Sequence, residues 1–300
     1  MISYGEHDGD AFAIKLANGR AQLHHLGPSA AIQRATRSTR ADLRRVATGL
    51  AAASVSTGLA ELNALLVGPI GAIAEAVTVI PTPDLFGVPW GGLPGFGDRS
   101  IAVAPNARMG TAASSRRGNR IVLVSGPGLV EGKREIDAIN QTVADAVVLV
   151  ADAANRDNVV NAVEGAAVAH IAAHGHIRTD NPLFSSLDLS DGPFSVYELE
   201  SLREQPGVVV LSACHVGLPS AQPGRELLGL VGALLGMGTR TVIASTLPLP
   251  DTPATTRYMA DLHGAMAEGQ APAAAALSAQ RAAGADAMIC RAALTVFGTA

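Results

Sequence analysis

Short apolar runs alternate with helical segments through the second half of this 300-residue sequence, and this alternation is its most restrictive feature. The runs are rich in β-branched residues and lack a strict period of two, as expected of strands buried on both faces. They cover residues 121–125, 147–150, 168–173, 208–212 and 241–245, with helical segments near 133–146, 156–164 and 225–237 between them. This spacing is typical of βαβ crossovers, so the sequence predicts an α/β fold with a mainly parallel sheet flanked by helices.

The first half of the chain has a different pattern, a hairpin followed by helices. Residues 10–26 alternate apolar and polar side chains around an Asn-Gly pair, which predicts a β-hairpin. Residues 30–76 carry the periodicity of two amphipathic helices, and short strand candidates and a turn-rich linker at 105–120 follow. We therefore expect an N-terminal α+β half over residues 1–115, packed on a second half over residues 116–300.

Charge and apolar patterning argue against nucleic-acid and membrane partners. The formal net charge is −4, and the 22 basic residues form no dense run that could follow a phosphate backbone. No uninterrupted apolar run reaches the ~20 residues that span a bilayer, and the acidic first ten residues are unlike a secretory signal. The two cysteines, Cys214 and Cys290, lie far apart, which fits a reducing compartment. We therefore expect a cytoplasmic protein.

Two strand ends carry the residues of greatest chemical interest. His174 follows the run 168–173, and Cys214 follows the run 208–212. In a parallel sheet the active site lies at the carboxyl ends of the strands, and neighbouring strands are ~4.8 Å apart. An imidazole there could reach the thiol and keep it as a nucleophilic thiolate. The N–H groups of Gly175 and Cys214 could form an oxyanion hole.

Each of these residues also has a plainer interpretation. Taken singly, Cys214 is a small buried hydrophobe at a strand end, and His174 is a loop histidine. Their matching positions, each followed within a few residues by glycine, favour a His/Cys dyad. His170 lies four residues inside the same strand, so we expect it to have a core or second-layer role.

Metal and nucleotide sites are weaker alternatives. His174, His176, Cys214 and His215 are residue types that bind zinc, but no C-x-x-C or H-E-x-x-H motif supports such a site. The glycine-rich stretch 126–134 departs from both the P-loop and the dinucleotide fingerprint, so we interpret it as a turn before a helix. The sequence therefore predicts neither a metal nor another cofactor.

The ordered set of motifs resembles the CHAT domain family, which is related to caspases and separases. The matching segments are residues 86–94, 135–139, 172–175, 182–189, 209–214, 226–230 and 236–242. The resemblance implies a bacterial protein with a caspase-like sheet, a catalytic half at residues 116–300, and a His/Cys dyad at His174 and Cys214. Such domains are often attached to tetratricopeptide repeats. This chain has none, so a regulatory protein partner or a repeat-containing region outside it is expected.

The segment after the fifth strand is where caspase-like proteases hold an extended peptide. Here it is residues 245–251, which lack the tryptophan common in CHAT domains. If the segment is extended, Pro248 and Pro250 remove donors from one edge only, although they could equally serve just to protect that edge. Asp251 could face a basic side chain before the scissile bond, whereas Ser212, two residues before Cys214, supplies no charge. The candidate substrate-binding residues are Ser212, Ser245, Leu247, Leu249 and Asp251.

The leading prediction is a cysteine endopeptidase that hydrolyses peptide bonds in a protein or peptide substrate through a thioester on Cys214. A catalytically silent protein-interaction or signalling domain of the same fold is the main alternative. A metal-dependent hydrolase is a weaker one.

Overall fold

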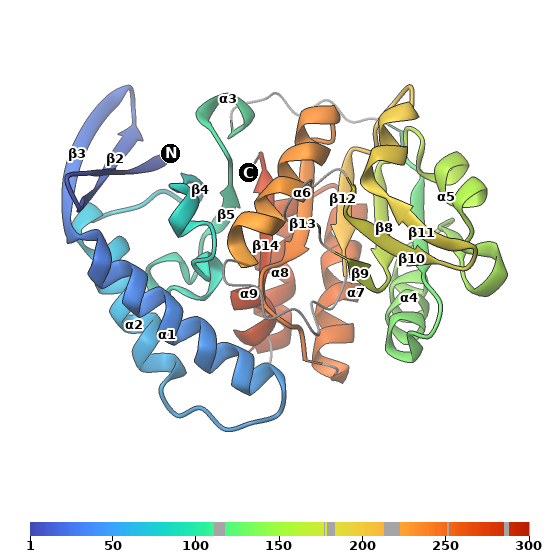
Figure 1. Cartoon of the computed structure of the whole chain (residues 1–300), viewed down its shortest axis with the longest axis horizontal. Coiled ribbons are helices and arrows are strands. Elements are labelled where there is room, and N and C mark those ends of the chain that lie inside the picture. The colour runs from blue at the N-terminus through green and yellow to red at the C-terminus, as the bar shows by residue number, and fades with distance from the viewer. Residues whose placement is uncertain are drawn as a thin grey trace.

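The computed structural model is organised around one large sheet that runs through both halves of the chain (Figure 1). The structure describes residues 1–110, 118–176, 178, 184–212, 223–250, 252–284 and 288–299. Within them the sheet has 11 strands in the order β3-β2-β1-β4-β5-β14-β13-β12-β8-β6-β7. These are β1 (Ile2–His7), β2 (Asp10–Ala17), β3 (Arg20–Pro28), β4 (Ala76–Ile80), β5 (Ser100–Val103), β6 (Ile121–Ser125), β7 (Val147–Leu149), β8 (Val168–Ala172), β12 (Val208–Leu211), β13 (Thr241–Ser245) and β14 (Leu294–Gly298).

The five strands predicted in the second half form a continuous parallel block, β13-β12-β8-β6-β7. In β6, β8, β12 and β13 every residue is buried, which explains why their sequences show no alternation. In register, residues 208–211 of β12 lie opposite residues 168–171 of β8. The predicted α/β class with a mainly parallel sheet is therefore confirmed.

Helices cover both faces of this block. Side chains of α4 (Val130–Thr142), α7 (Pro253–Ala267) and α8 (Pro272–Ala283) share one apolar cluster with one face of the sheet. Side chains of α5 (Arg156–Val163) and α6 (Pro223–Met237) share the cluster on the other face, and Figure 1 shows α6 lying in front of the central strands. The three helices predicted between the strands are thus present. Of the helices in the described ranges, none combines the length and apolarity needed to cross a bilayer.

The N-terminal half joins the same sheet edge to edge. β1, β2 and β3 form an antiparallel meander, β1 continues in parallel to β4, and β5 pairs with β14. The predicted hairpin is present, and Asn18 and Gly19 have φ angles of 51° and 72°, as a two-residue hairpin turn of this kind requires. The two predicted helices are α1 (Ser29–Ala47) and α2 (Val55–Leu66), which pack on each other and on β3.

Several elements were not predicted from the sequence. β14 pairs antiparallel with β13 in the middle of the sheet and joins the two halves. It follows α9 (Met288–Ala293) without a turn signal between them. A second sheet has the order β11-β10-β9 and consists of β9 (Gly175–His176), β10 (Ser186–Leu189) and β11 (Gly192–Ser195). The stretch predicted as a linker contains the short helix α3 (Ala107–Gly110).

Candidate functional site

His174 lies just beyond the carboxyl end of β8. The strand ends at Ala172, Ala173 is completely buried, and His174 itself is exposed. Its carbonyl oxygen accepts a hydrogen bond of 2.9 Å from the backbone N–H of Asp188 on β10. The main chain of this histidine is therefore fixed by the second sheet, and its side chain is accessible to a substrate.

Cys214 lies outside the residues that the structure describes, but the strand that leads to it is defined. Leu211 on β12 lies opposite Ile171 on β8, and the backbone N–H of Ser212 donates to the carbonyl oxygen of Ile171 at 3.1 Å. The parallel pairing thus extends one residue past the strand. Cys214 follows Leu211 by three residues, and His174 follows Ile171 by the same number.

Gly175 starts the second sheet directly after His174. It lies opposite Leu187 of β10 in an antiparallel pair. Because Asp188 donates to His174, the pair His174/Asp188 occupies a hydrogen-bonded position of the ladder. Gly175 then falls in the alternate position, where the N–H points away from β10. This N–H is oriented away from the ladder, as an oxyanion donor has to be.

The other candidate substrate-binding residues differ in accessibility. Ser212 is half-buried; Ser245 ends β13, is buried, and lies opposite Leu294 of β14. Leu247 is only 2% exposed and belongs to the core, so its backbone alone remains for contact with a peptide. Leu249 is half-buried, and the chain bends at residues 246–247 instead of continuing β13 straight. Asp251 lies outside the described residues.

A buried polar cluster connects α4, β8, α7 and the end of β12. Oε1 of Glu135 on α4 lies 2.8 Å from Nε2 of His170 on β8, a close ion-pair contact whose atoms are not aligned as a hydrogen bond. Nδ1 of His170 lies 2.9 Å from Nε2 of His263 on α7, with the two rings edge to face. Oε2 of Glu135 accepts a hydrogen bond of 3.1 Å from Oγ of Ser212.

The sequence carries a signal for only part of this cluster. His170 is completely buried, as a core or second-layer role requires, and it interrupts an otherwise apolar strand. Glu135 falls within a motif of the resemblance, whereas His263 stands in a helix with no motif around it. The contacts between them depend on how α4 and α7 pack on the sheet, which no local pattern encodes.

Burial determines the protonation of two groups near this cluster. It lowers the pKa of the His263 imidazole well below its ordinary value, and the charge of His170 lowers it further. It also raises the pKa of the Cys290 thiol; the side-chain hydrogen bond between Cys290 and Thr255 opposes this rise, and the charge of Glu135 adds to it. His263 is therefore neutral and Cys290 protonated near neutral pH.

The residues suited to a metal do not gather into a site in the part of the chain that the structure describes. No group of three or more His, Cys, Asp or Glu side chains there could hold an ion. Nε2 of His176, one of the zinc candidates, lies 3.0 Å from Oδ2 of Asp188 on the neighbouring strand. His174 is described but not part of such a group, and Cys214 and His215 lie outside the described residues.

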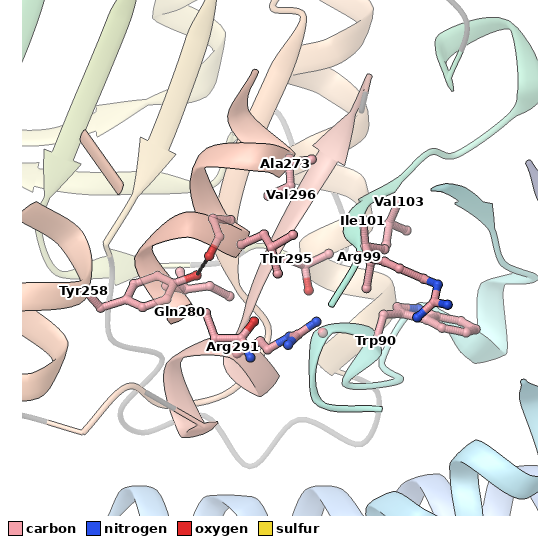
Figure 2. Close-up of a pocket in the computed structure, with 14 residues that line it drawn as sticks. Trp90, Arg99, Ile101, Val103, Tyr258, Ala273, Gln280, Arg291, Thr295 and Val296 are labelled. Carbon is pink, nitrogen blue, oxygen red and sulfur yellow. Dashed lines mark hydrogen bonds between the residues drawn. The ribbon is translucent and has the colours of Figure 1, made fainter. Parts of the chain in front are cut away.

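A small cavity lies between α8, α9, β5 and β14 (Figure 2). Its volume is about 40 Å³. The hydroxyl of Tyr258 donates a hydrogen bond of 3.2 Å to the main-chain oxygen of Ala276, drawn as a dashed line in Figure 2. Trp90 Nε1 and Gln280 Oε1, from two lining residues, are buried without a hydrogen-bond partner among the described residues. A space of this size admits water but no peptide.

Comparisons with known proteins identify a family and a fold. The family model described as CHAT domain matches residues 56–289. Two crystal structures of the Saccharomyces cerevisiae separase–securin complex are similar, with TM-scores of 0.54 and 0.53 at 14% and 12% sequence identity. The matches cover 74% and 80% of this chain but only 15% and 17% of those chains. No curated protein matches the sequence. The separase likeness confirms the caspase-like sheet.

Proposed function

Because the chain belongs to the CHAT domain family, we propose that it is a cysteine endopeptidase with Cys214 as nucleophile and His174 as general base. The observation that carries the proposal is the register of β8 and β12. Ile171 and Leu211 lie opposite each other, and each precedes one of the two candidates by three residues. Adjacent strands are ~4.8 Å apart, so equivalent positions beyond their ends lie within reach of one proton transfer.

The proposed reaction has two steps that share the same groups. His174 accepts the thiol proton of Cys214, and the thiolate attacks the carbonyl carbon of the scissile bond. Backbone N–H groups of Gly175 and Cys214 donate to the oxyanion, and His174 returns the proton to the leaving amine as the thioester forms. A water molecule, deprotonated by His174, then attacks the thioester and releases the acid with the free thiol.

Substrate binding and regulation follow from the same proposal. An extended peptide would run beside residues 245–250, with backbone contacts from Ser245, Leu247 and Leu249 and side-chain contacts from Ser212 and Asp251. The separase structures contain securin, a second protein. We propose that this chain also meets protein partners, acts in the cytoplasm, and uses residues 116–300 as its catalytic half with residues 1–115 as structural support.

A second candidate function is a catalytically silent interaction domain. Phe184 and Tyr197 are each 53% exposed and stack with ring centroids 6.3 Å apart. Tyr197 also lines an open groove together with Val160 and Glu200. Exposed aromatic pairs of this kind are common in protein interfaces, so the chain could bind a partner without cleaving it.

Digestion of a peptide library by wild type and by Cys214→Ala tests the proposed function. We expect wild type to cleave and Cys214→Ala to be inactive with an unchanged circular dichroism spectrum, because the sulfur carries the covalent step. Cys290→Ala is the matched control and should retain cleavage. Equal digestion by wild type and Cys214→Ala would refute the dyad. An alkylation rate of Cys214 no faster than that of an ordinary thiol, together with no digestion, would favour the silent domain.

A further inference from the structure

His170 lies in the middle of β8, where polar groups are costly to bury. Its neighbours across the sheet are Leu123 on β6 and Val210 on β12, and all three are completely buried. An ionised or polar group here loses its hydration without compensation unless the protein supplies partners. The partners that the fold supplies are Glu135 and His263.

The contacts assign the protons in this cluster. His263 is neutral, so its Nε2 accepts from Nδ1–H of His170, and its own proton is on Nδ1. Nε2 of His170 faces Oε1 of Glu135 at 2.8 Å, the distance of a close ion pair. The ring of His170 is thus held between the carboxylate of Glu135 and the ring of His263.

The thiol of Cys290 is a further titratable group that feels the charge of Glu135. The charge of Glu135 acts on the thiol of Cys290 on α9, which is protonated and contacts Thr255 of α7 through Sγ and Oγ1 at 3.6 Å. Because this thiol is neutral, it does not compensate the negative charge of Glu135. The carboxylate is therefore balanced by His170 and by the hydroxyl of Ser212.

Ser212 connects this cluster to the proposed nucleophile. Its backbone N–H binds the β8 carbonyl of Ile171, and its hydroxyl binds Glu135. The residue therefore has both its main chain and its side chain fixed, two positions before Cys214. A hydrogen bond to a carboxylate is roughly twice as strong as one to a neutral acceptor. The charge on Glu135 therefore strengthens the hydrogen bond that fixes the Ser212 side chain.

We propose that the Glu135–His170 ion pair is a positioning device that holds Ser212, and through it the segment that carries Cys214, in register with His174. The inference rests on the proposed function, because the hydrogen bond between Ser212 and Glu135 serves catalysis only if Cys214 is the nucleophile. His263 fixes the ring of His170 from the other side. Glu135 and His170 touch no substrate, so they are positioning residues that act through Ser212.

The first test follows the alkylation of Cys214 by iodoacetamide across pH, with the modified peptide identified by mass spectrometry. Ser212→Ala should lower the alkylation rate about tenfold, since a small misplacement of a reacting group has effects of this order or larger. Ser212→Thr keeps the hydroxyl and should restore most of the rate. Ser125→Ala is the control: Ser125 ends β6, is buried, and its hydroxyl donates a long hydrogen bond of 3.5 Å to the carbonyl oxygen of Gly126 instead of binding a carboxylate.

The second test is a double-mutant cycle with Glu135→Gln. This substitution should slow alkylation in wild type but change little in the Ser212→Ala background, because the effect passes through the serine. Glu131→Gln, on the exposed side of α4, is the control. On peptides cleaved by wild type, the loss should appear in kcat and not in KM.

Three outcomes decide the proposal. If Cys214 of the wild-type chain is alkylated no faster than an ordinary thiol, both the proposed function and this inference are refuted. Fast alkylation in wild type with an unchanged rate in Ser212→Ala overturns the positioning role alone, as does an equal loss from Glu135→Gln in both backgrounds. If Glu135→Gln does not fold, the Ser212 series still decides.

Discussion

The guanidinium of Arg40, on α1, donates a hydrogen bond of 2.9 Å to the carbonyl oxygen of Thr246, 206 positions later in the chain. The same group donates to the carbonyl oxygen of Gly87 at 2.5 Å. Burial lowers the pKa of Arg40 to about 10, with the charge of Arg44 acting in the same direction, yet the group stays cationic at neutral pH. Thr246 directly follows β13, so one buried side chain joins the N-terminal half to the candidate substrate segment.

Replacing Arg40 with alanine should lower the free energy of unfolding by roughly 2–4 kcal/mol, because two carbonyl oxygens lose their donors and the aliphatic stem loses its packing. Urea unfolding followed by circular dichroism measures the change. Arg37→Ala on the exposed side of α1 is the control and should shift stability by less than about 0.5 kcal/mol. Equal effects of the two substitutions would show that the buried link is unimportant.

The neutral state of His263 makes stability depend on pH. Its folded-state pKa lies well below the ordinary value of 6.5, so below that pH the unfolded chain binds a proton that the folded chain does not. Stability should therefore fall as the pH drops from 7 to 5, with a contribution approaching 1.4 kcal/mol per pH unit below the unfolded-state pKa.

Urea unfolding at pH 7 and pH 5 measures this slope. His263→Leu should unfold more easily at pH 7 but lose less stability between the two pH values than wild type does. His7→Gln, at an exposed position on β1, should keep the wild-type slope. If His263→Leu also keeps the wild-type pH dependence of stability, the buried imidazole is not the cause of that dependence.

The sequence predicted the strands and helices wherever local pattern and fold agree. The parallel block was readable because every residue of strands such as 121–125 and 168–172 is buried, and the hairpin because Asn18 and Gly19 suit positive φ. β14 could not be predicted, since its place between β13 and β5 is decided by pairing with strands distant in sequence. For the same reason, the N-terminal half was expected to pack on the sheet, and the pairing of its strands into that sheet was not anticipated.

For the same reason, only part of the candidate site could be predicted from the sequence. The position of His174 beyond β8 was predictable from the end of an apolar run. The contact between Glu135 and Ser212 was not, because it depends on how α4 packs against the end of β12. From the sequence, Ser212 is a residue without charge; in the structure it is bonded to a carboxylate.

Cys290 should be inert toward alkylation in the folded chain. It is 1% exposed, and burial raises the pKa of its thiol, so little thiolate forms at pH 8. Iodoacetamide should modify it at least about tenfold more slowly than free cysteine, and as fast as free cysteine once the chain is unfolded in urea. Peptide mass spectrometry separates its signal from that of Cys214. Rapid labelling in the folded state would mean that α9 opens readily.

Gly126 directly follows β6, at a point where the chain lies very close to the residues around His174. Its N–H donates to the carbonyl oxygen of Ala172 at 2.7 Å. A β-carbon at this position would lie 2.5 Å from the carbonyl oxygen of Asp188 and 2.9 Å from Cβ of Ala173. Ala173 precedes His174, and Asp188 binds its carbonyl oxygen, so both displaced neighbours hold the candidate base.

Gly126→Ala should therefore lower the free energy of unfolding by roughly 1–3 kcal/mol, as overpacking does. It should also reduce cleavage of peptides found with wild type by about tenfold or more, because His174 moves with its neighbours. Gly236→Ala is the matched control: it lies on the exposed side of α6 with no atom within 4 Å of the added carbon. There alanine should raise stability by about 0.4–1 kcal/mol and leave cleavage unchanged. Full activity in Gly126→Ala would mean that the spacing between β6 and the His174 segment does not set the position of the base.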